Sequence, residues 1–90
     1  MPFWAFKSGR DDSFGSRLVR ARNEGLLRGS REAKLFRLAV GKSFERQQAL
    51  DWLNTVIDEG RSELVDQHAS EREVETWDLG CRIAFFVELS

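Results

Sequence analysis

The sequence is poor in the residues that form disulfides and metal sites. Its 90 residues include one cysteine, Cys81, and one histidine, His68. A single cysteine excludes an intramolecular disulfide framework and is typical of a reducing compartment. One histidine and one cysteine are too few for a zinc or iron–sulfur site within one chain. We therefore predict no metal and no other cofactor.

Long apolar runs are also missing. No stretch approaches the ~18 apolar residues that a membrane-spanning helix needs. The first residues, MPFWAFKSGRDD, lack the long apolar core of a signal peptide. We expect a cytoplasmic protein that does not contact a membrane.

Catalytic patterns are equally scarce. Cys81 and His68 could in principle form a nucleophile–base pair, but Cys81 falls on an apolar face, where a thiol is normally buried and inert. Glu71, Glu73 and Glu75 form the one dense acidic group, and nothing in the sequence places them in a cleft. No phosphate-binding loop is present. We predict that the protein is not an enzyme and has no small-molecule substrate.

Length and composition indicate one small folded domain, residues 1–90. A chain of this size buries only about 60–65% of its unfolded surface. The 41% hydrophobic and 32% charged content is typical of a folded soluble protein. Seven phenylalanines and three tryptophans are many for so small a core. Either the core is aromatic or some rings face a partner.

Charge is divided along the chain. Residues 1–46 carry eleven Lys and Arg against five Asp and Glu, whereas residues 47–90 carry three against ten. The basic residues are concentrated between 17 and 37, and guanidinium groups suit phosphate geometry. This basic cluster consists of Arg17, Arg20, Arg22, Arg28, Arg31, Lys34 and Arg37.

The clearest predicted element is an amphipathic helix over residues 43–60. Apolar side chains fall on one broad face of this segment, and polar ones fall on the opposite face. Ser43 is a suitable N-cap and Gly60 a suitable residue just past the C-terminus.

Two segments alternate between apolar and other residues, as strands do. They are residues 33–40 and 81–89, and residues 3–7 form a third, short aromatic strand. The predicted fold class is therefore α+β, with a small, mostly antiparallel sheet covered by the 43–60 helix. The expected core is Phe36, Leu38, Val40, Leu53, Val56, Ile57, Ile83, Phe85 and Val87.

Other segments leave alternatives open. Residues 16–27 fit a helix or a strand pair, and Gly25, Gly29 and Ser30 argue against one uninterrupted element through residue 30. Ser70 with Glu73 has the spacing of a capping box, which allows a short helix from 71 to about 78, but a strand over 70–79 fits equally well. A small all-α bundle is the alternative fold.

The segment from Arg37 to Gly60 resembles the opening of sporulation-related repeat (SPOR) domains. The matching positions are Val40-Gly41, Phe44, Ala49, Leu53 and Gly60, following a strand, and they cover about a quarter of the chain. The resemblance implies an α+β fold and binding of peptidoglycan glycan strands. It assigns no binding residue here.

Taken together, these patterns predict a small interaction or regulatory protein that docks on a protein partner or self-associates as a dimer. The basic cluster leaves three alternatives: it meets the acidic half of the same chain or of a second copy, it binds nucleic acid, or it binds an acidic protein. A nucleic-acid-binding module is the alternative function. The rings expected at a protein interface are Trp4, Phe6, Trp77 and Phe86.

Overall fold

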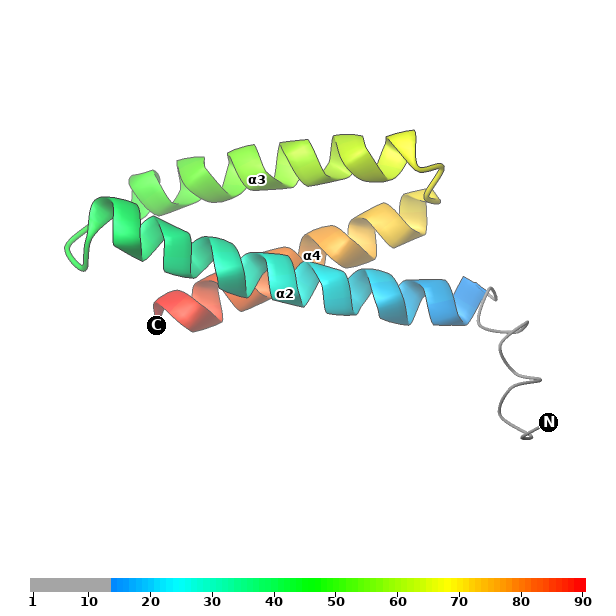
Figure 1. Cartoon of the computed structure of the whole chain (residues 1–90), viewed down its shortest axis with the longest axis horizontal. Helices are drawn as coiled ribbons and strands as arrows, with labels where there is room; N and C mark the ends of the chain where they lie inside the picture. The colour runs from blue at the N-terminus through cyan, green and yellow to red at the C-terminus, as the bar shows by residue number, and fades with distance from the viewer. Residues whose placement is uncertain (1–13) are drawn as a thin grey trace.

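Three α-helices make up the part of the chain that the structure, a computed structural model, describes, residues 14–90 (Figure 1). They are α2 (Phe14–Val40), α3 (Arg46–Asp66) and α4 (Glu71–Leu89). The chain runs along α2, returns along α3 and runs back along α4, so α2 and α4 are parallel neighbours. Within this described range, none of the helices is long and apolar enough to cross a membrane.

The predicted α+β fold is wrong, because no strand occurs in residues 14–90. Residues 33–40 form the last turns of α2 and residues 81–89 the second half of α4, while the predicted strand 3–7 lies outside the described residues. Short apolar segments satisfy both periods: Ala33, Phe36 and Val40 also have helical spacing. The all-α alternative matches the structure, and the strand that the SPOR resemblance requires is absent.

The central helix, α3, begins and ends later than predicted. Its first turn is capped at Glu45, whose backbone N–H donates to Oε1 of Gln48 (2.8 Å). Gly60 lies inside the helix and makes room for Trp77, since a Cβ at residue 60 would lie 2.0 Å from the indole ring. His68 follows the end of the helix with a φ of 63°, the left-handed conformation that commonly ends a helix.

The predicted capping box at the start of α4 is confirmed. The Glu73 backbone N–H donates to Ser70 Oγ (3.2 Å), and the Ser70 backbone N–H donates to Glu73 Oε1 (3.3 Å). The helix does not stop near residue 78 but continues through Gly80 to Leu89.

Glycines bring α2 and α4 into backbone contact. A Cβ on Gly25 would lie 2.3 Å from the carbonyl oxygen of Trp77, and one on Gly29 would lie 2.1 Å from that of Cys81. Gly80 is the matching contact point on α4, since a Cβ there would lie 2.9 Å from a backbone oxygen of α2. The glycines that suggested breaks in the sequence are contact points between two helices.

All three helices contribute buried side chains to the core, and several of these are aromatic rings. Phe36 packs edge-on against Phe44 and Trp52, with ring centroids 5.0 and 5.4 Å apart, and lies 6.1 Å from Phe85. Val40 is partly buried against this cluster. The core prediction is confirmed for five residues: Phe36, Leu53, Val56, Ile57 and Phe85.

The same prediction is wrong for three residues that were placed by strand alternation. Leu38, Ile83 and Val87 are 85%, 50% and 68% exposed. An α-helix repeats every 3.6 residues, so residues two apart point to nearly opposite sides. Leu38, Ile83 and Val87 therefore lie opposite the buried Phe36 and Phe85 rather than beside them.

Candidate interaction surfaces

Part of the basic cluster is paired with α4. Arg17 Nε lies 3.9 Å from a Glu73 carboxylate oxygen, and Lys34 Nζ lies 3.6 Å from one of Glu88. Arg37 donates to the carbonyl oxygen of Leu89 (2.8 Å), at the negative end of the α4 dipole. The basic half of the sequence therefore meets the acidic half along the α2–α4 contact.

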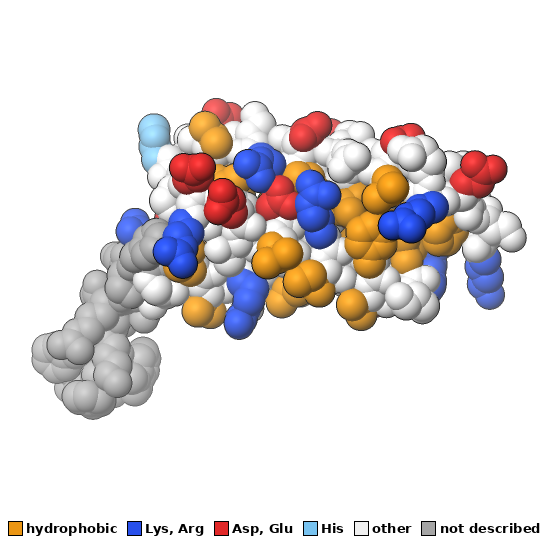
Figure 2. All heavy atoms as spheres, turned by 180° about the vertical axis from the view of Figure 1, so that it is seen from behind, with side chains coloured by type: hydrophobic (Ala, Val, Ile, Leu, Met, Phe, Trp, Pro, Cys, Tyr) orange, Lys and Arg blue, Asp and Glu red, His pale blue; other side chains and the backbone are white. Residues whose placement is uncertain are grey.

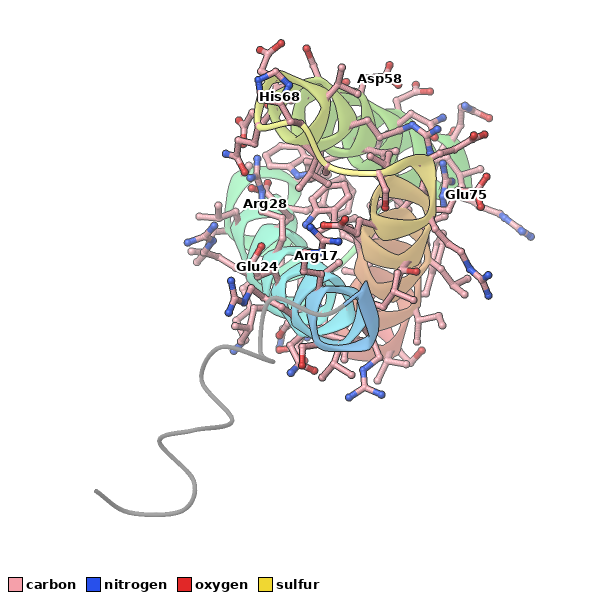
Figure 3. All side chains as sticks on the ribbon, turned by 90° about the vertical axis from the view of Figure 1, so that its right-hand side faces the viewer. Arg17, Glu24, Arg28, Asp58, His68 and Glu75 are labelled. Carbon is pink, nitrogen blue, oxygen red and sulfur yellow. The ribbon has the colours of Figure 1, made fainter. Side chains whose placement is uncertain are left out.

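Arg28 belongs to a network that joins α2 to α3. Its Nε donates to Glu32 Oε2 (3.1 Å), and its guanidinium lies 3.9 Å from Glu59. The other oxygen of Glu32 accepts from the indole Nε1 of Trp52 (3.1 Å). Figure 3 shows Arg28 directed toward the space between the helices.

Two members of the basic cluster face solvent and make neither an ion pair nor a side-chain hydrogen bond within residues 14–90. They are Arg20 and Arg31, both on the exposed side of α2. Arg22 is also exposed, and its guanidinium donates to the neighbouring Asn23 side chain (3.3 Å). These three arginines of the basic cluster form no ion pair within residues 14–90.

A second ionic contact ties α3 to α4. Asp78 accepts from Arg61 of α3 (2.6 Å) and from Arg82 one turn along α4. Its carboxylate is 13% exposed. In Figure 3, by contrast, Asp58 and Glu75 point outward from the bundle.

An open groove of about 580 Å³ runs between α2 and α3. Trp77 and Gly60 contribute to its lining, together with Arg28 from α2 and Glu63 from α3. Arg28 is already held by its carboxylate partners, and no buried side-chain polar atom in the described range lacks a hydrogen bond. No buried unsatisfied group therefore lines the groove, and Arg31, which lines it without an ion pair in residues 14–90, is exposed.

The cysteine and the histidine lie in different environments. Cys81 is fully buried against α2, and burial raises the pKa of its thiol to about 11. His68 is exposed in the turn between α3 and α4. The structure does not bring them together as a catalytic pair.

The outer face of α4 carries a cluster of exposed apolar side chains. From residue 79 to residue 87, four exposed residues are large and apolar, and the Arg82 side chain beside them is 42% exposed. These side chains lie within one third of the helix circumference, on the side turned away from the buried Trp77, Cys81 and Phe85. Figure 2 shows hydrophobic side chains gathered over the middle and lower part of this side of the molecule. The α4 outer face consists of Leu79 (61% exposed), Ile83 (50%), Phe86 (40%) and Val87 (68%).

Of the rings expected at an interface, the structure leaves one on this face. Phe86 is exposed and packs edge-on against Phe85, with centroids 5.7 Å apart. Trp77 instead lies in the core, 5% exposed, and Trp4 and Phe6 lie outside the described residues.

The aliphatic members of the α4 outer face were missed as surface residues. Thr76, Leu79, Ile83 and Phe86 are spaced by three, four and three residues, which is the pattern of a helix–helix seam. That signal was available in the sequence, but it becomes readable only once the segment is known to be helical.

Comparisons with protein families, with curated proteins and with solved structures returned no match for this chain. Its function is therefore inferred from its own residues.

Proposed function

We propose that this protein is a small helical docking module that binds another protein chain through the α4 outer face. The observation that supports the proposal is the cluster of four exposed apolar side chains between Leu79 and Val87 on one side of α4. Contiguous exposed apolar surface of this kind marks interaction sites in soluble proteins. An aromatic ring next to aliphatic side chains is also the usual composition of the centre of an interface.

The ion pairs of α2 support the same function. Contacts within the molecule use the charges of Arg17, Arg28 and Lys34, so part of the basic cluster belongs to the helix contacts. Binding energy then comes mainly from burial of apolar side chains, and the remaining arginines contribute to orientation.

Site-specific photo-cross-linking tests this function. A benzophenone amino acid at position 83 should cross-link to another protein chain, whereas one at Thr55 on the exposed side of α3 should not. The adduct should disappear with Val87→Glu and persist with Leu27→Glu, a matched apolar-to-acid change on α2, where Leu27 is 72% exposed. Equal yields at positions 83 and 55, or adducts insensitive to Val87→Glu, would exclude the proposed surface.

Nucleic-acid binding is a second candidate, supported by Arg20 and Arg31. Neither has a carboxylate partner in residues 14–90, and both lie on the exposed side of α2. Fluorescence anisotropy with labelled DNA and RNA should then show affinity that falls steeply with salt, and Arg20→Ala with Arg31→Ala should lower the salt slope by about 2. Arg46→Ala on α3 is the control. Undetectable binding at low salt removes this candidate.

A further inference from the structure

We infer that the chain bound by the α4 outer face is a second copy of this protein, paired α4 against α4 in antiparallel orientation about a two-fold axis. This inference rests on the docking function proposed above and identifies its partner. The resulting contact joins the same surface of both copies, as the closed interface of a two-fold dimer does.

The spacing of the exposed residues is that of a two-helix seam. Leu79, Ile83 and Phe86 follow a three-and-four repeat on the outward side of α4, and Val74, Trp77 and Cys81 follow the same repeat on the inward side. Such a repeat lets one helix interlock with another along its length. The inward residues are buried within the bundle, whereas the outward residues have no helix packed against them among residues 14–90.

Charges beside the outward seam are complementary to themselves. Glu75 and Arg82 lie seven residues apart, so they occupy the same flank of the helix, about 10 Å from each other along its axis. A two-fold axis perpendicular to an antiparallel helix pair brings this flank of one copy against the same flank of the other. With the axis beside Leu79, Glu75 of each copy meets Arg82 of the other copy. The Nε of Arg82 already donates to Asp78, and its remaining guanidinium N–H groups are the donors for Glu75.

Both halves of α4 contribute to the contact. With the axis beside Leu79, this residue packs on Leu79 of the other copy, and Ile83 and Phe86 lie against residues 71–76 of that copy. The apolar side chains at the end of each α4 are therefore covered by the more polar start of the other α4, which gives a small interface with a polar rim. A parallel arrangement would place like charges opposite one another at Glu75 and at Arg82, so the antiparallel pair is favoured.

Sedimentation equilibrium with charge-exchange variants tests the pairing. The wild-type mass should rise with concentration from the 10.4 kDa of one chain toward twice that value. Glu75→Arg alone and Arg82→Glu alone should each weaken the dimer by about tenfold or more, because each creates two like-charge contacts. An equimolar mixture of the two variants should restore the dimer as a heterodimer, since every facing pair is then Arg with Glu.

A second pair of variants keeps the test decisive if Arg82→Glu disturbs the fold through its contact with Asp78. Ile83→Glu should give a folded monomer with an unchanged circular dichroism spectrum, while Leu27→Glu should leave the dimer intact.

The inference is overturned if the wild type stays monomeric at millimolar concentration. It is also overturned if Ile83→Glu still dimerises, or if folded charge variants do not recover on mixing. A monomer that still gives specific cross-links from position 83 to a different protein would refute the second copy as partner and leave the docking function standing. A monomer without such cross-links would refute both.

Discussion

Gly29 lies so close to the carbonyl oxygen of Cys81 that a methyl group in place of its hydrogen would have to displace the α4 backbone. The Cβ position is 2.1 Å from that oxygen, whereas nothing lies within 4 Å of the Cβ position of Gly15. We expect Gly29→Ala to reduce the free energy of unfolding by about 3 kcal/mol or more. Gly15→Ala should raise it by about 0.4–1 kcal/mol, because it restricts the unfolded chain.

Urea unfolding monitored by circular dichroism measures both changes. If Gly29→Ala were as stable as the Gly15→Ala control, the backbone contact between α2 and α4 would not exist in solution.

The Cys81 thiol makes stability depend on pH in the alkaline range. Burial raises its pKa from an ordinary 9.0 to about 11, and Arg28 opposes this shift. Above pH 9 the unfolded chain loses this proton while the folded chain keeps it. The free energy of unfolding therefore has its full value below pH 9. It falls by roughly 2–3 kcal/mol as the pH rises to 11, the amount expected for a difference of two pKa units.

Cys81→Ala lacks the thiol and should show a shallower fall over the same range in urea unfolding. Parallel curves for the two proteins would contradict burial of an ionisable thiol at this position.

At the scale of single elements, the start of α4 depends on Ser70. Its hydroxyl accepts from the Glu73 backbone N–H (3.2 Å) and donates to the Glu73 carboxylate (2.9 Å). Ser70→Ala should cost about 1 kcal/mol, the usual effect of removing an N-cap. Ser62→Ala, on the exposed side of α3, should be neutral within about 0.5 kcal/mol. Thermal unfolding of both variants checks this, and equal effects would mean that the cap does not stabilise α4.

The elements differ in how far the sequence could predict them. The apolar face of α3 depends on local spacing alone and was predicted correctly, whereas the capping-box spacing at Ser70 left helix and strand open. Residues 81–89 were misread because alternation and helical spacing coincide over so few residues. Gly25, Gly29 and Gly80 suggested breaks, since glycine disfavours a helix when no neighbour requires its small size. Only the packed structure shows that the opposing backbone requires it.

The candidate surface was predicted in part for the same reason. Phe86 was expected at an interface, and the structure leaves it exposed on the α4 outer face. Ile83 and Val87 were assigned to the core, because a strand would have placed them beside Phe85. Trp77 was expected at an interface because the core looked too small for its ring. The ring is buried because Gly60, which has no side chain, leaves room for it.

For the whole molecule, the arrangement of three helices explains why one face is left apolar. α3 covers α2 and α4 from one side, and its buried residues complete the core there. The outer side of α4 has no fourth helix against it within residues 14–90. A second copy placed on that side would cover the exposed residues of both chains and supply the burial that so small a core lacks.

The two isoleucines of the sequence provide the most direct measurement of this account. Ile57 is 2% exposed and Ile83 is 50% exposed, so the methyl spectrum of an isoleucine-labelled sample contains one core signal and one from the α4 outer face. With a soluble paramagnetic relaxation agent, the dilute protein should show Ile57 protected and Ile83 strongly relaxed. As the concentration rises, Ile83 should become protected while Ile57 stays unchanged. An Ile83 methyl already protected in the dilute monomer, or one still relaxed at millimolar concentration, would contradict the account.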